Sequence, residues 1–119
     1  MSVRHLIATS KASVKTRIQA VLAGNFDGNF IIVDRENIEL DPNEVIEVVV
    51  PDFRRALFIA GVQPRGGGKF AFGGFSTIDG TFQFASDSKY PMQMTSFSFL
   101  EIHRHRRPPI RVFPPDDID

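Results

Sequence analysis

Apolar residues occur in short runs along the chain, and many of them alternate with polar residues. Gly, Pro, Asn and Asp separate these runs at spacings of roughly ten residues. Alternation with a period of two is typical of strands that bury one face. The pattern predicts an all-β fold, an antiparallel β-sandwich or barrel of about seven or eight strands, with a jelly-roll-like arrangement as one alternative.

Residues 12–23 fit two periodicities. A helix over this segment would place four apolar residues on one face, namely Val14, Ile18, Val21 and Leu22. A strand would alternate the apolar residues with Lys15, Arg17 and Gln19. The following Asp27-Gly28 pair is a strong hairpin signal and requires a strand to lead into it. We therefore favour a strand and keep a short helix as the alternative.

Three other apolar runs are predicted to be extended. The run "HLIATS" within residues 1–10 is predicted as a strand or an arm. The runs "VIEVVV" and "RRALFIAGV" flank Pro51 and are predicted as two strands, because β-branched residues favour strands and Pro interrupts them. Residues 1–106 are accordingly expected to form a single β domain.

Glycine and phenylalanine are concentrated between Pro64 and Phe84. The pair Asp79-Gly80 predicts a second hairpin, in which Ile78 lies opposite Thr81. The residues predicted to share one face are Phe75, Thr77, Phe82 and Phe84.

At two places in this half of the chain the apolar residues change parity, that is, they switch between even and odd sequence positions. A β-bulge at Gly73-Gly74 would turn Phe70 and Phe72 to the face of Phe75. In "MQMTSFSFLEIHRH" the apolar residues also change parity, from Met92 and Met94 to Phe97 and Phe99 and back to Leu100 and Ile102. This second pattern predicts a long strand that bends between two sheets or is covered on both sides.

The C-terminal residues 107–119 contain four prolines and are predicted as an extended arm. We expect the arm to lie on a neighbouring subunit. The predicted interface residues are Arg104, Arg106, Arg107, Ile110, Arg111, Val112 and Phe113.

Composition narrows the class of protein. The chain has 119 residues, 42% of them hydrophobic, which is the size and composition of one globular domain. Twelve Phe against one Tyr and no Trp indicate rings buried in a core or against a partner. The absence of Cys, of a signal peptide and of an apolar span predicts a virion or cytoplasmic protein without disulfides or a membrane partner.

Opposite charges are segregated along a chain of zero net charge. Residues 1–24 contain four basic residues and no acid, whereas residues 34–52 contain seven acids and one Arg. The region 101–113 is basic again, and the tail 114–119 is acidic. Matched blocks favour association between copies of the chain over general polyanion binding.

Motifs for catalysis are missing from the sequence. "GVQPRGGGKF" lacks the Ser or Thr that follows the lysine of a P-loop. Glu101, His103 and His105 alternate on one strand, with His5 as a further imidazole, but the neighbouring arginines would repel a metal ion. We predict no catalytic residue, cofactor or metal, and hence no enzyme.

The favoured hypothesis is a non-enzymatic structural protein, a subunit of a symmetric assembly such as a small virion component (phage capsid decoration, penton or connector). It would be a homo-oligomer or bind other subunits.

The alternative hypothesis is a single-stranded nucleic-acid-binding module. The segment "FPPDDID" resembles the acidic tails of single-stranded DNA-binding proteins, although here the last residue is Asp119 and not Phe. This module would stack bases on Phe70, Phe72 and Phe75 and meet phosphates with Arg65, Lys69, Arg104 and Arg106. Buried rings favour the first hypothesis, and rings exposed beside arginines favour the second.

Overall fold

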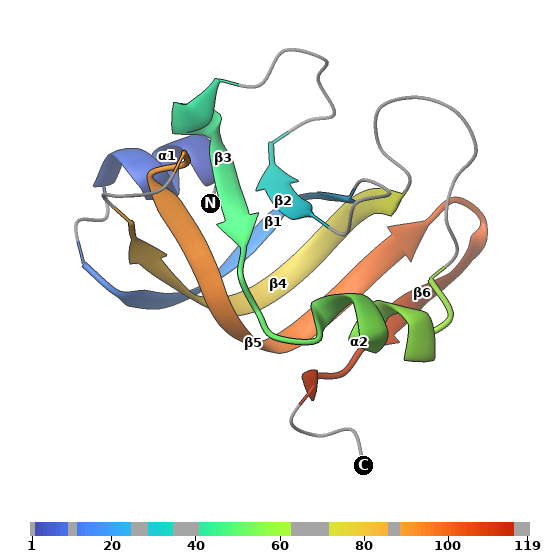
Figure 1. Ribbon diagram of the computed structural model, residues 1–119. Coiled ribbons are helices and arrows are strands. Elements are labelled where there is room, and N and C mark those ends of the chain that lie inside the picture. The colour runs from blue at the N-terminus through green and yellow to red at the C-terminus, as the bar shows by residue number, and fades with distance from the viewer. Residues whose placement is uncertain are drawn as a thin grey trace.

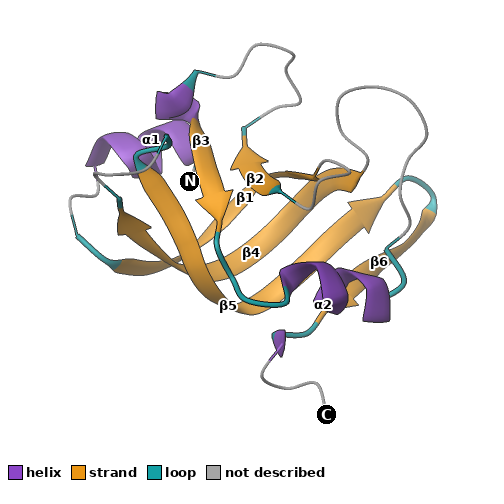
Figure 2. Ribbon diagram, in the orientation of Figure 1, coloured by secondary structure: helices purple, strands orange, loops and turns teal. Residues whose placement is uncertain are grey.

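The computed structural model describes residues 2–9, 12–24, 29–34, 41–62, 72–85 and 89–115 (Figure 1, Figure 2). Its strands are β1 (Val14–Gly24), β2 (Phe30–Val33), β3 (Val45–Val48), β4 (Phe72–Phe84), β5 (Met92–Arg104) and β6 (Arg107–Val112). Its helices are α1 (Val3–Thr9), α2 (Phe53–Ile59) and the short 3-10 helix η1 (Pro42–Glu44).

Five of the strands close into a barrel. The strand order is β3-β2-β1-β4-β5-β6. A parallel pairing of β3 with β5 closes the first five of these strands into the barrel, and β6 is added at the edge beside β5. The order β3-β2-β1-β4 is a Greek key, because the fourth strand returns to lie beside the first. The predicted all-β barrel is therefore confirmed at this level, although the described residues form six strands and not seven or eight.

β1 follows the predicted alternation. Ile18, Ala20 and Leu22 are buried in the core, whereas Lys15 and Arg17 are exposed. The strand pairs with β4 along its whole length and with β2 over its last four residues, Val21 to Gly24. The strand prediction for residues 12–23 is confirmed and the helical alternative is wrong. The turn at Asp27-Gly28 lies outside the described residues.

Two segments predicted as extended are helices. Residues 5–9 of "HLIATS" belong to α1, which buries Val3 and Leu6. The segment "RRALFIAGV" overlaps α2, which buries Phe53, Ala56 and Leu57. Spacings of three and four residues place these apolar side chains on one helical face. The two helices lie on opposite sides of the barrel in Figure 1 and cover the same core.

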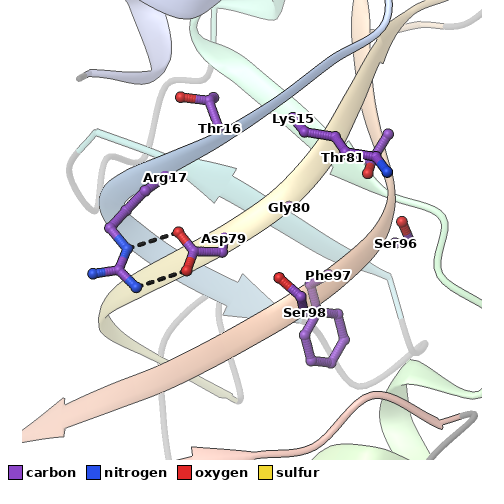
Figure 3. Close-up of a pocket in the computed structure, with 9 residues that line it drawn as sticks. All are labelled: Lys15, Thr16, Arg17, Asp79, Gly80, Thr81, Ser96, Phe97 and Ser98. Atoms are coloured by element: carbon purple, nitrogen blue, oxygen red, sulfur yellow. Dashed lines mark hydrogen bonds and ion pairs between the residues drawn. The ribbon is translucent and has the colours of Figure 1, made fainter.

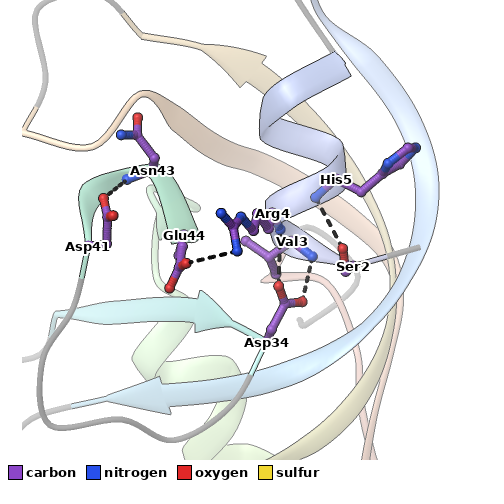
Figure 4. Close-up of polar contacts among 8 residues, drawn as sticks. All are labelled: Ser2, Val3, Arg4, His5, Asp34, Asp41, Asn43 and Glu44. Atoms are coloured by element: carbon purple, nitrogen blue, oxygen red, sulfur yellow. Dashed lines mark hydrogen bonds and ion pairs between the residues drawn. The ribbon is translucent and has the colours of Figure 1, made fainter.

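Phe53 links α2 to the strands. Its ring makes edge-to-face contacts with Phe30, at a centroid distance of 5.1 Å, and with Phe97, at 5.7 Å. Such pairs contribute about 0.5–1.5 kcal/mol each beyond the area they bury. On the other side, the Asp34 carboxylate accepts hydrogen bonds from the N–H groups of Val3 and Arg4 at the start of α1 (Figure 4).

β4 is one unbroken strand, so the hairpin predicted at Asp79-Gly80 is wrong. Its pairing with β1 runs without a shift from Val14 opposite Phe82 to Gly24 opposite Phe72. A strand paired on both sides satisfies more backbone groups than a hairpin would. Gly80 serves packing and not a turn, since a Cβ there would lie 2.9 Å from the Met94 sulfur.

The predicted face and bulge in β4 are also wrong. Gly73 and Gly74 are in regular register with β1, and Phe75 is exposed while Phe82 is fully buried. The side chains of Phe70 and Phe72 lie outside the described residues.

β5 is the long strand predicted from the parity change, but the change is caused by bulges within one sheet and not by a bend between two sheets or by cover on both sides. Between its pairs with β4, the strand accommodates Thr95 and Ser98 as extra residues. Each extra residue shifts the alternation by one position. The residues that point into the core as a result are Met92, Met94, Phe97, Leu100 and Ile102.

Residues 107–112 form a strand of the same sheet and not a free arm. β6 pairs with β5 in an antiparallel register that places Val112 opposite Leu100 and Ile110 opposite Ile102. Val112 is fully buried. Pro108 and Pro109 are compatible with this strand because β6 lies at the edge of the sheet. Residues 116–119 lie outside the described part.

Candidate functional site

Polar and aromatic side chains gather on the outside of β1, β4, β5 and β6, which we call the outer face. The register aligns Arg17, Asp79 and Phe99 across three strands, and Glu101 lies opposite Arg111 on β6. The outward side chains of β2 differ, since all four of its residues are buried. The outer face is therefore the part of the sheet where polar and aromatic side chains contact solvent.

A bidentate ion pair lies in the middle of the outer face (Figure 3). The Arg17 guanidinium donates from Nε to Asp79 Oδ1 over 2.7 Å and from Nη2 to Oδ2 over 2.6 Å. The hydrogen bond and then the charge of Asp79 raise the pKa of Arg17, and the hydrogen bond from Arg17 lowers the pKa of Asp79. The pair fixes the plane of the guanidinium beside Phe99.

Arginines and phenylalanines alternate next to this pair. The Arg17 Cζ atom lies 5.1 Å from the centre of the Phe99 ring, and the Arg111 Cζ atom lies 4.0 Å from it. The same Arg111 carbon is 5.3 Å from the centre of the Phe113 ring, which is 55% exposed. We call Arg17, Phe99, Arg111 and Phe113 the Arg–Phe ladder. It offers flat cationic and aromatic surfaces side by side.

A second aromatic group lies further along the outer face. The Phe75 ring is 48% exposed, and its centre is 5.8 Å from that of the His103 imidazole. Thr77 Oγ1 and His103 Nε2 are 3.0 Å apart and hydrogen-bonded. This bond holds the imidazole close to Phe75.

A hollow of about 400 Å³ opens on the outer face where β1, β4 and the bulged part of β5 meet (Figure 3). Its polar lining consists of Lys15, Thr16, Arg17, Asp79, Thr81, Ser96 and Ser98. Lys15, Thr81 and Ser96 are aligned across the three strands by the register.

The acidic block meets the start of the N-terminal basic block at α1, whereas the C-terminal basic block lies at β5 and β6. Asp34 and Glu44 contact α1, where Arg4 and Glu44 form an ion pair of 3.7 Å (Figure 4). Among the described residues, Arg111 and the arginines of the β5–β6 hairpin make no ion pair with a carboxylate. The Arg104 guanidinium donates to the Pro108 carbonyl oxygen instead. These arginines therefore form no salt bridge among the described residues, although Glu101 lies opposite Arg111 in the register.

Some of the residues predicted for an interface are exposed and others are buried. Those that are exposed are Arg104, Arg106, Arg107, Arg111 and Phe113. Val112 is buried and Ile110 is packed against the core, because β6 belongs to the same sheet.

Of the residues predicted to bind nucleic acid, Phe75 lies on the outer face, whereas Arg65, Lys69 and Phe70 lie outside the described residues. Sequence reasoning missed Arg17 and Phe99. The alternation of β1 placed Arg17 outward, but only the register of β4 and β5 brings it to Phe99.

The sequence argues against Glu101, His103, His105 and His5 as metal ligands. The part of the chain that the structure describes contains no group of three metal-ligating side chains. It also contains no helix long and apolar enough to cross a membrane. No family model matches the chain, and no significant similarity to a curated protein or a solved structure was found.

Proposed function

We propose that this protein binds single-stranded nucleic acid on its outer face. The observation that carries the proposal is the Arg–Phe ladder, in which the Arg111 guanidinium carbon lies 4.0 Å from the centre of the Phe99 ring and 5.3 Å from that of the exposed Phe113 ring. Bases stack on aromatic rings and on guanidinium planes, and arginines also bind phosphates. The exposed rings beside arginines favour this hypothesis over the structural one that the composition suggested.

The residues have distinct roles in this interface. The exposed rings of Phe75 and Phe113 provide stacking surfaces, and Arg106, Arg107 and Arg111 neutralise phosphates. Stacking accepts any base, so the expected binding depends on salt more than on sequence.

The separation of charge supports the proposal despite zero net charge. Asp34 and Glu44 lie at α1, whereas Arg111 is part of the ladder and Arg104, Arg106 and Arg107 lie in the β5–β6 hairpin of the same sheet. A local basic surface attracts a polyanion even where the whole chain is neutral.

The architecture is compatible with this function. Five-stranded Greek-key barrels include the OB-folds, which bind oligonucleotides through a sheet face and adjoining loops. This is a likeness in architecture only, and one fold serves many functions. The side chains of the outer face, and not the architecture, therefore support this function.

The test is fluorescence anisotropy with a labelled oligothymidylate of about 16 nucleotides. Truncation of one stacking ring costs about 1–3 kcal/mol, so Phe113→Ala is expected to weaken binding by roughly fivefold to a hundredfold. Phe58→Ala is the matched control, because Phe58 is 80% exposed on α2 and takes no part in the ladder. Absence of binding by the unmodified chain, or equal losses in the two variants, would refute the proposal.

A second candidate is a subunit of a symmetric assembly such as a virus particle. The apolar side chains of Val49, Phe58 and Ile59 are exposed around α2, at 38%, 80% and 52%, and lie outside the interface proposed above. Exposed apolar groups of this kind mark contacts with other proteins. Light scattering on the same samples decides this candidate, since a monomer at all concentrations up to the millimolar range would exclude self-assembly.

A further inference from the structure

The hollow at the bulges of β5 has a lining suited to an oxyanion. Two bulges place Thr95 and Ser98 as extra residues in β5, and the hollow lies at this distorted part of the sheet. Bulges next to binding sites re-aim side chains. Here the hydroxyl groups of Thr81, Ser96 and Ser98 line the same space as the Lys15 side chain.

The charges in the hollow favour a single negative charge. Lys15 and Arg17 are cationic, and Asp79 is the one carboxylate in its lining. That carboxylate accepts two hydrogen bonds from Nε and Nη2 of Arg17, which leaves Nη1 without a partner among the described residues. The lining therefore has two cationic side chains against one carboxylate, a guanidinium nitrogen without a hydrogen-bond partner among the described residues, and four hydroxyl groups.

We propose that this hollow is a phosphodiester subsite, in which Lys15 and Arg17 Nη1 meet the charge and Thr81 and Ser96 donate hydrogen bonds. The inference rests on the proposed function and deepens it. Arg17 belongs both to the hollow and to the ladder, and its guanidinium carbon lies 5.1 Å from the centre of the Phe99 ring. One nucleotide therefore places its phosphate in the hollow and its base near Phe99.

The test is the salt dependence of oligothymidylate binding in Lys15→Gln. Loss of one phosphate contact with single-stranded nucleic acid makes the slope of log K against log salt concentration less steep by about 0.7. The matched control is Lys89→Gln, because Lys89 is also exposed but lies over the Tyr90 ring, with its nitrogen 5.4 Å from the ring centre. The control is expected to keep the slope of the unmodified chain. Ser96→Ala is expected to lower the affinity and leave the slope unchanged, since it removes a neutral donor.

The outcomes separate the subsite from the proposed function. If the unmodified chain binds and Lys15→Gln keeps its full slope, the subsite is wrong and the nucleic-acid interface stands. If the unmodified chain does not bind oligothymidylate, the interface is wrong, and titration with inorganic phosphate followed by amide NMR shifts then tests the hollow alone. Shifts confined to Lys15, Thr81 and Ser96 support an oxyanion site, and their absence overturns it.

Discussion

Substitution of Val112 by Ala tests whether β6 pairs with β5 of its own chain or with β5 of a neighbouring copy. Val112 is fully buried opposite Leu100, although it lies in the proline-rich region whose sequence suggests an arm. The change removes two methyl groups, worth about 1.6 kcal/mol at about 0.8 kcal/mol each. A residual cavity of about 40 Å³ adds about 1 kcal/mol.

The expected loss is therefore about 2.5 kcal/mol of unfolding free energy. At about 4 °C per kcal/mol for a domain of this size, the melting temperature falls by about 10 °C. Circular dichroism melts at two protein concentrations a hundredfold apart measure this loss. An intramolecular strand gives the same loss at both concentrations, whereas a strand exchanged between copies makes stability depend on concentration.

The neighbouring residue provides the control. Phe113 is 55% exposed, so Phe113→Ala is expected to change stability by less than about 0.5 kcal/mol. The two adjacent substitutions are thus expected to change different properties. Val112→Ala lowers stability, whereas Phe113→Ala lowers nucleic-acid binding. A loss below about 0.5 kcal/mol in Val112→Ala, or a loss that varies with concentration, would refute the intramolecular assignment of β6.

Two further predictions concern β4. Gly74→Ala is expected to lower the free energy of unfolding by about 1–3 kcal/mol, because its Cβ would lie 2.8 Å from the Cγ2 atom of buried Ile102. The midpoint of urea unfolding measures this loss, and an unchanged midpoint would contradict it. Asp79→Asn is expected to be less stable than the unmodified chain above pH 3.8, the ordinary pKa of the carboxyl, because ionised Asp79 holds Arg17. Since Arg17 lowers the pKa of Asp79, this difference disappears as the pH falls through that lowered pKa, and a difference that persists in strong acid would exclude the ion pair as its cause.

Local sequence patterns identified β1 and β5 as strands but not the number of strands in the fold. In β1, alternation of Ile18, Ala20 and Leu22 with outward polar residues fixes both the strand and its buried face. The parity change between Met94 and Phe97 likewise signals the irregular part of β5. These features depend on the period of two along a strand, which is visible within a few residues of sequence.

Local patterns were insufficient where partners distant in sequence decide the conformation. Asp79-Gly80 has the composition of a hairpin turn, but pairing with β1 and β5 on both sides keeps it extended. The segment around Phe53 has the residues of a strand, but the barrel needs a helix there to bring Phe53 between Phe30 and Phe97. Short apolar runs fit either element, so the core that they join determines the outcome.

The candidate site is a product of register. The sequence determined that arginines and phenylalanines are abundant and that β1 directs Arg17 outward. Only the pairing of β5 with β4 and β6 brings Phe99 next to Arg17 and Arg111, which are far apart in the chain. A shift of one residue in either pairing would turn these side chains to the opposite face. Composition therefore supplied the chemical groups, and the tertiary structure decided which of them meet.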